Sequence, residues 1–227
     1  MLISISPVWA MIGLDTMMII YSFWILSYSK PLGSKKFIVL GVLAAWLLVL
    51  HLGLSNQVLF DNDISGIAFL MVIFAGVGAV GALLFIIPAI RKLVVGMDQR
   101  QLMLMQGIRV FFGAVFLMWA STGDLPQAFG TLDGFTHIGA GFFGLIAAFS
   151  VATGVQERRR VWFANLFGLT DILVVASTLA LVLLPQIGPH HPMMYAVFLP
   201  APLWLWFHVI SIWKLLCETD RANANQV

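Results

Sequence analysis

Seven long stretches of nearly uninterrupted apolar side chains dominate this 227-residue chain. A helix that crosses a lipid bilayer needs about 20 mainly apolar residues, and these stretches have that length. Membrane-spanning barrels show instead short segments of alternating hydrophobicity. The sequence therefore predicts an all-α fold, a single domain over residues 1–227 built as a seven-transmembrane-helix bundle. The expected spans are 8–28, 37–54, 64–90, 102–121, 135–154, 161–184 and 194–216.

Composition excludes most other protein classes. Hydrophobic residues make up 61% of the chain and charged residues only 10%, whereas soluble domains carry about 25% charged residues. Disorder requires the opposite balance, with low hydrophobicity and high net charge. The net charge of +2, with no basic stripe, predicts no nucleic-acid partner. A lipid bilayer is the expected partner.

The chain contains a single cysteine, Cys217. One cysteine excludes an internal disulfide framework and a cysteine-based zinc or iron–sulfur site. The first apolar stretch follows no Lys or Arg and contains Asp15. Because a secretory signal begins with a positively charged region, we interpret residues 8–28 as a retained first helix.

The charges in the connections predict an orientation. Every Lys and Arg except Arg109 lies on one side of the predicted bundle: Lys30, Lys35, Lys36, Arg91, Lys92, Arg100, Arg158, Arg159, Arg160, Lys214 and Arg221. The alternate connections carry no Lys or Arg, and their ionisable residues are aspartates and histidines. Since cytoplasmic loops carry the excess of Lys and Arg, we expect the N-terminus outside and the C-terminus in the cytoplasm. The protein is then a multi-pass protein of the plasma membrane.

Polar residues inside the fourth, sixth and seventh spans form the first candidate site. Arg109 lies about two turns into the fourth span, and Asp171 and His208 lie at similar depth in the sixth and seventh. Charged residues in a bilayer core are costly and usually face the bundle interior. The predicted ligand-binding cluster is Gln106, Arg109, Asn165, Asp171 and His208. The alternative is that an Arg109–Asp171 pair serves only to lock helices together.

A second group of polar residues lies near the predicted outer face. Asp15, His51 and His137 are the candidate metal ligands, with His190 and His191 in the last outer loop. Imidazoles and carboxylates suit zinc, copper or iron, and two histidines on facing helices can hold haem. His137 follows Asp133 by four residues, so both share a face if the helix already includes Asp133. The alternative is a solvated rim of interfacial histidines.

Residues 101–216 resemble a set of uncharacterised bacterial polytopic integral membrane proteins. The resemblance rests on Gln106-x-x-Arg109 with Gly113, on Gly123-x-Leu125-Pro126 with Phe129, on Asn165-x-x-Gly168-x-x-Asp171, and on Pro202, His208 and Trp213. This chain departs from the set at His137, where those proteins tend to have Asp. The resemblance implies a bacterial inner membrane location and carries no activity.

Three hypotheses about function follow from these residues. The first is a transporter, channel or receptor-like protein that binds a small ligand, ion or proton between spans 4, 6 and 7. The second is a membrane enzyme or electron carrier that uses a metal or haem at the outer histidines. The third is an accessory subunit of a membrane complex, or a homo-oligomer, whose helices offer contact surfaces.

Overall fold

The computed structural model describes residues 6–27 and 35–224, where the regular structure is helical, without β-strands. Seven helices in this part are long and apolar enough to cross a membrane, as the sequence predicts. The first two are α1 (Pro7–Ser27) and α2 (Lys35–Ser55). Lys30, one of the charges used for orientation, lies outside the described residues.

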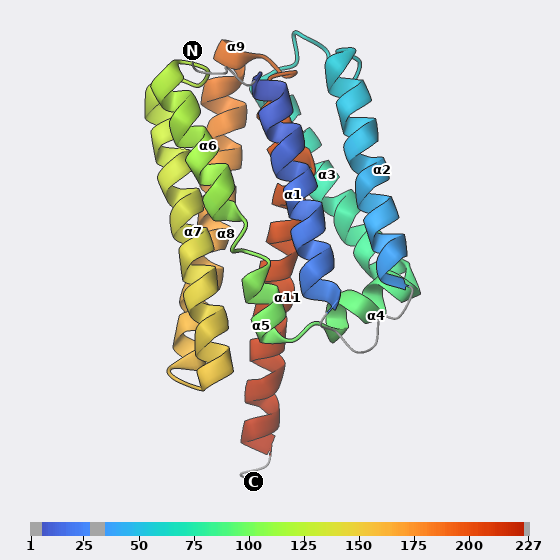
Figure 1. Cartoon of the computed structure of the whole chain (residues 1–227), viewed down its shortest axis with the longest axis vertical. Coiled ribbons are helices and arrows are strands. Elements are labelled where there is room, and N and C mark those ends of the chain that lie inside the picture. Colours follow the sequence, from blue (N-terminus) through green and yellow to red (C-terminus); the bar gives the residue numbers. More distant parts are fainter. Residues whose placement is uncertain (1–5, 28–34, 225–227) are drawn as a thin grey trace.

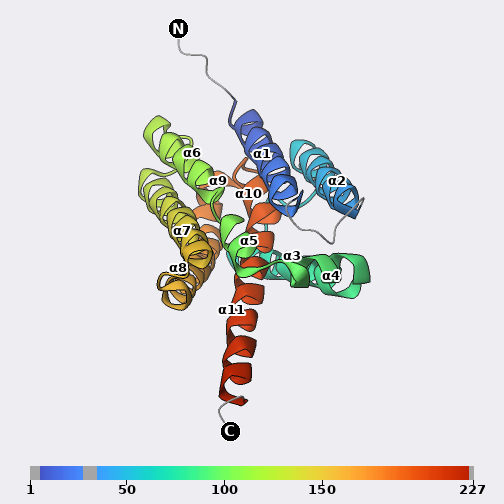
Figure 2. The same ribbon diagram turned by 60° about the horizontal axis from the view of Figure 1, so that its bottom comes forward.

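The bundle is arranged around its last helix. Helix α11 (Pro200–Ala224) runs through the middle, with α6, α7 and α8 on one side and α1, α2 and α3 on the other (Figures 1 and 2). It packs on α8, α3 and α5. Side chains on α11 can therefore reach several other spans.

The third span ends earlier than the predicted 64–90. Helix α3 (Gly66–Ile86) is capped at its N-terminus by Ser65, whose hydroxyl accepts a hydrogen bond from the Ala68 amide at 3.3 Å. Pro88 then opens a separate helix, α4 (Pro88–Gly96), which lies across the bundle at the C-terminal end (Figure 1). Proline lacks the N–H that a helix interior needs, so α3 does not continue through Pro88. In the first turn of a helix this N–H has no partner within the helix, so proline fits there. The apolar stretch over 64–90 is therefore divided at Pro88 into two helices.

The fourth span, predicted over 102–121, lies within one candidate span over Gln99–Thr122, but that span is built from two helices with an interruption between them. Helix α5 (Gln99–Leu104) is closed at its start by a capping box between Asp98 and Gln101. Helix α6 (Arg109–Thr122) follows after a tight turn. In that turn the amides of Gln106 and Gly107 bond to carbonyls three residues earlier, at 3.1 and 2.8 Å. Such turns inside a helix often mark functional positions.

The sixth and seventh spans are also irregular. Helix α8 (Glu157–Thr178) continues through a π-helical segment (Leu179–Leu183) into α9 (Leu184–Ile187). The predicted seventh span over 194–216 is two helices, α10 (Met194–Phe198) and α11. The break falls at Leu199, directly before Pro200.

Helix α7 (Gln127–Thr153) begins at Gln127 rather than at the predicted 135, and it lies close against α6. Glycines make this approach possible: a Cβ at Gly134 would lie 2.9 Å from the Gly113 carbonyl oxygen and closer still to Leu117. Small residues at helix contacts let backbones approach in membrane bundles. The early start places Asp133 and His137 well inside α7 instead of at its outer rim.

Candidate functional site

The five residues of the predicted ligand cluster lie together and are all buried. We call them the polar centre: Gln106, Arg109, Asn165, Asp171 and His208. Gln106 comes from the interruption in the fourth span, Arg109 from the first position of α6, Asn165 and Asp171 from α8, and His208 from α11. The structure therefore joins spans 4, 6 and 7, as the depth of these residues suggests.

Arg109 holds the polar centre together. Its Nη2 donates to Asp171 Oδ2 in an ion pair. Its Nη1 lies 3.4 Å from both Gln106 Oε1 and His208 Nε2, and its guanidinium lies 5.1 Å from the Trp204 ring centroid. The guanidinium of Arg109 is therefore in contact with side chains from the sixth and seventh spans as well as with its own span.

The neighbours of His208 determine its protonation state. Arg109 has only N–H donors to offer, so His208 Nε2 accepts. Asn165 Nδ2 donates to Ser211 Oγ at 2.7 Å, which leaves Asn165 Oδ1 to accept from His208 Nδ1 at 2.9 Å. His208 is therefore neutral, with its proton on Nδ1. Ser211 in turn donates to Gln99 Oε1 at 2.7 Å, so hydrogen bonds continue from the polar centre to α5.

Helix α7 adds two residues that the sequence assigned elsewhere. His137 Nδ1 lies 2.7 Å from Asp133 Oδ1 and 3.5 Å from Asp171 Oδ2. Ligand atoms of Asp133, His137 and Asp171 all lie within 4.8 Å of one another. We call these three residues the triad. It shares Asp171 with the polar centre, so the fifth span belongs to the same site.

Several atoms in this site have no hydrogen-bond partner. They are Asp133 Oδ1 and Oδ2, Asp171 Oδ1, His137 Nδ1 and Arg109 Nε. The 2.7 Å approach of His137 to Asp133 is close enough for an ion pair, but the atoms are not aligned for a hydrogen bond. Buried polar atoms without partners are rare and call for an explanation such as a bound water or ion.

A cavity borders the triad. Asp133 and His137 form its polar part, and apolar side chains form the rest of its wall, including Phe116, Leu179 of the π-helical segment and Met193. The irregular sixth span thus shapes the space next to the triad. π-Helical turns frequently occur at functional sites.

The other candidate metal ligands lie in a separate group. His51 Nδ1 is 2.7 Å from the Tyr195 hydroxyl and 3.2 Å from Ser55 Oγ. Asp15 is buried in α1, and neither of its carboxylate oxygens has a hydrogen-bond partner. In the described residues, the three-residue group suited to a metal contains His137 but neither His51 nor Asp15. The set proposed from sequence is therefore not brought together.

The two loop histidines differ in their contacts. His191 Nε2 lies 3.1 Å from the Asp124 carbonyl oxygen, and its Nδ1 accepts from the Met193 amide at 3.1 Å. His190 packs on Phe60, and its Nε2 has no hydrogen-bond partner. His191 thus ties the loop before α10 to the connection between α6 and α7, which is a structural role.

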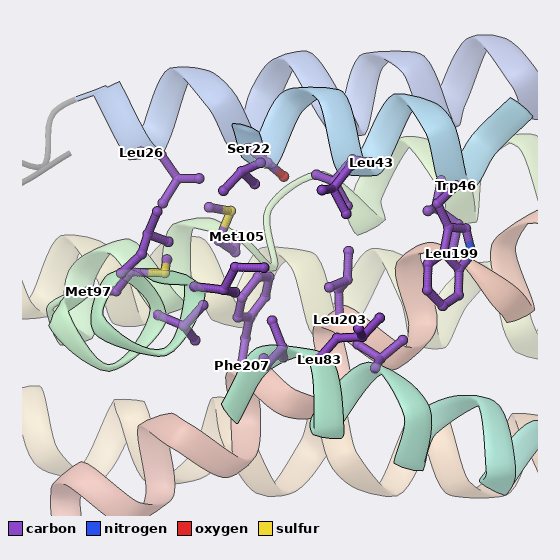
Figure 3. A pocket seen from close by; sticks show the side chains of 17 residues that line it. Ser22, Leu26, Leu43, Trp46, Leu83, Met97, Met105, Leu199, Leu203 and Phe207 are labelled. Carbon is purple, nitrogen blue, oxygen red and sulfur yellow. The ribbon is translucent and has the colours of Figure 1, made fainter. Parts of the chain in front are cut away.

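A second cavity lies between α1, α2, α3, α4 and α11, apart from the polar centre (Figure 3). Apolar side chains such as Leu43, Leu203 and Phe207 surround it, with the Ser22 hydroxyl as one polar exception. The described residues that line it include no Asp, Glu, His, Lys or Arg. Its chemistry suits only apolar contact.

Comparison with known proteins identifies a family but assigns no activity to it. The chain matches no curated protein and no solved structure. Residues 66–216 match a family described as a domain of unknown function (DUF8737). This region contains the third to seventh spans, and with them every residue of the polar centre and the triad. Because the match covers more than half of the sequence, the chain belongs to the DUF8737 family.

Proposed function

We propose that the chain is an integral protein of the bacterial inner membrane, with its N-terminus outside and its C-terminus in the cytoplasm. The distribution of charge supports this orientation. The described Lys and Arg positions other than Arg109 lie at the end that carries α4 and the C-terminus (Figure 1). Asp61, Asp63 and Asp124 lie at the opposite end. Cytoplasmic faces carry the positive excess.

We further propose that the polar centre, together with the triad, binds a small ligand or ion inside the membrane, in a transporter, channel or receptor-like protein. The observation that carries this proposal is the unused hydrogen-bonding capacity of buried charged groups. Asp133 has two oxygens without partners, and Asp171 and Arg109 each have one such atom. An occupant would supply the missing partners.

The main alternative is that these residues only hold the helices together. Polar side chains that serve only this purpose are expected to satisfy one another, because an unsatisfied buried group costs about 1–3 kcal/mol, and more when it is charged. Gln99, Asn165 and Ser211 fit that description, since each of their side-chain polar atoms has a hydrogen-bond partner. Asp133, His137 and Asp171 do not fit it. The triad, whose polar atoms lack partners, is therefore the part of the site that an occupant would contact.

The test is a thermal-unfolding screen of the detergent-purified full-length protein. The probes are Na⁺, K⁺, Mg²⁺, Ca²⁺, Mn²⁺ and Zn²⁺ as chlorides, and phosphate and acetate as sodium salts. A compound that binds the folded protein raises its free energy of unfolding by mass action, by about 2.7 kcal/mol at a hundredfold excess over its Kd, and so raises the Tm. We expect at least one probe to raise the Tm of the wild-type protein.

The matched control is the double variant Arg109→Met with Asp171→Leu, which removes both charges and keeps apolar bulk. We expect it to fold and to lose the response to that probe. If no probe changes the wild-type Tm and the double variant is more stable than the wild type, the charged pair serves only to hold the helices together and the proposal is wrong.

A further inference from the structure

We propose that the occupant of the triad is a divalent transition-metal ion, held by Asp133, His137 and Asp171. This inference rests on the proposed function and names the ligand of the same site. Its basis is that three buried side chains from two helices place ligand atoms within 4.8 Å of one another. In addition, His137 Nδ1, both Asp133 oxygens and Asp171 Oδ1 have no hydrogen-bond partner.

The spacing of the ligand atoms suits a shared ion. Imidazole nitrogen and carboxylate oxygen bind zinc at about 2.0–2.2 Å, which puts two neighbouring ligands of one ion about 2.8–3.6 Å apart in octahedral or tetrahedral geometry. His137 Nδ1 lies 2.7 Å from Asp133 Oδ1 and 3.5 Å from Asp171 Oδ2. The three ligand atoms lie within 4.8 Å of one another, so small side-chain adjustments suffice for one ion to contact all three.

Charge favours a cation at this point. Two carboxylates and the Arg109 guanidinium give the site a formal charge of −1 when His137 is neutral. A divalent ion changes this to +1, so we expect an anion such as hydroxide or chloride as a further ligand. The mixed set of one imidazole and two carboxylates suits zinc, manganese or iron(II) better than calcium or magnesium, which prefer oxygen alone.

Neighbouring residues hold the side chains of the triad in position, as residues around metal ligands usually do. Arg109 holds Asp171 through Oδ2 and leaves Oδ1 without a partner. The edges of Phe116 and Trp204 pack against the His137 ring, with centroids 5.4 and 5.7 Å away. Partners of this kind fix the orientation of metal ligands. The cavity beside Asp133 and His137 leaves room for a further ligand.

The experiment measures metal binding by the full-length protein in detergent, with any purification tag removed. Chelator-treated protein is titrated with Zn²⁺, Mn²⁺ and Co²⁺, and bound metal is counted by elemental analysis after desalting. We expect about one ion per chain, and for Co²⁺ visible absorption bands of a bound ion. Asp133→Asn and His137→Gln should each weaken binding at least tenfold.

Matched controls use the same substitutions elsewhere. Asp61→Asn lies on an exposed loop, and His51→Gln lies in the other histidine group. Both should bind the metal as the wild type does. Metal retained at full affinity in both triad variants, or lost equally in His51→Gln, would overturn the assignment.

A second measurement does not depend on the variants folding. X-ray absorption of the zinc-loaded wild-type protein should show a first shell of nitrogen and oxygen ligands with the outer-shell scattering of one imidazole, and a shell containing sulfur or several imidazoles would exclude the triad. The two proposals can fail separately. If no metal binds but phosphate or acetate raises the Tm through Arg109, the intramembrane ligand site stands and the metal does not; if no probe has any effect, both fail.

Discussion

Gly168 of α8 lies directly against the imidazole ring of His208, and a Cβ at this position would overlap the ring. The ring has no free direction in which to move, since hydrogen bonds to Asn165 and Arg109 hold both of its nitrogens. The absence of a side chain at position 168 is therefore a condition for the polar centre to form.

The first prediction concerns this contact. Gly168→Ala should destabilise the protein by about 1–3 kcal/mol, the usual cost of forcing an extra methyl group into a packed core. The measurement is the Tm in detergent. Gly78→Ala is the control, because a Cβ there meets no atom within 4 Å; in the middle of a helix it should be neutral or slightly stabilising. Equal effects of the two substitutions would contradict the structure.

The second prediction concerns the ion pair between Arg109 and Asp171. Arg109→Met or Asp171→Leu alone leaves a buried charge without its partner, which costs about 3–5 kcal/mol. The double variant should recover a large part of that loss, since neither charge remains. A double-mutant cycle of unfolding free energies measures the coupling. Additive losses would show that the two side chains do not interact.

The third prediction concerns Tyr21 and the interrupted fourth span. The Tyr21 hydroxyl donates to the Leu104 carbonyl oxygen at 2.8 Å, where the helical hydrogen bonding of α5 stops. Tyr21→Phe leaves this carbonyl with the Gly107 amide as its donor and should cost about 0.5–1.5 kcal/mol, the net value of one hydrogen bond. Thr16→Ala is the control, because the Thr16 hydroxyl bonds only to Ile12 of its own helix. Comparable Tm values for both variants would refute a role for Tyr21 in closing the interruption.

The fourth prediction concerns pH and His191. Burial lowers the pKa of His191 below its usual value of 6.5, and the hydrogen bond to the Asp124 carbonyl only partly offsets this effect. Both ring contacts suit the neutral form, because Nδ1 accepts from an amide. The unfolded chain therefore binds a proton more readily than the folded one, and the contribution of His191 to stability is lost as the pH falls below about 6.5.

The measurement is the Tm of wild-type protein and His191→Gln at about pH 7.5 and about pH 5.5. The glutamine side chain does not titrate, so the variant should lose less stability on acidification than the wild type. The same acid-induced drop in both proteins would mean that other groups account for it.

The fifth prediction concerns the orientation in the membrane. In a Cys217→Ser background, Asn62→Cys between α2 and α3 should react with a membrane-impermeant maleimide in intact cells. Val155→Cys between α7 and α8 should react only after the membrane is opened. Both positions are exposed in the structure. The reverse pattern of labelling would invert the proposed topology.

The sequence predicts the number and approximate position of the seven spans, because bilayer thickness sets a minimum length for an apolar helix. It does not predict where they break. The third and seventh spans break beside prolines, Pro88 and Pro200, which are visible signals. The fourth breaks around Gln106 and Gly107 without a proline, and its turn is stabilised by contacts from α1 and α7 that no local pattern reveals.

Part of the candidate site was also predictable from the sequence. Arg109, Asp171 and His208 are noticeable in the sequence because charge and imidazole are costly in a bilayer. Asp133 and His137 were assigned to the outer rim because the fifth span was expected to start at 135. Gly123 in a left-handed conformation ends α6, and Pro126 directly precedes α7. These two residues are the local signal that could have placed the start of α7 correctly.

The ion pair also constrains how the protein is made. Arg109 and Asp171 lie 62 residues apart, so a ribosome working at about 5–20 residues per second delivers the aspartate about 3–12 s after the arginine. During that interval the fourth span carries an unpaired guanidinium. In the proposed membrane location, spans inserted in order of synthesis would leave this guanidinium without its aspartate until the sixth span emerges. The Arg109–Asp171 pair can therefore form only after synthesis has passed Asp171.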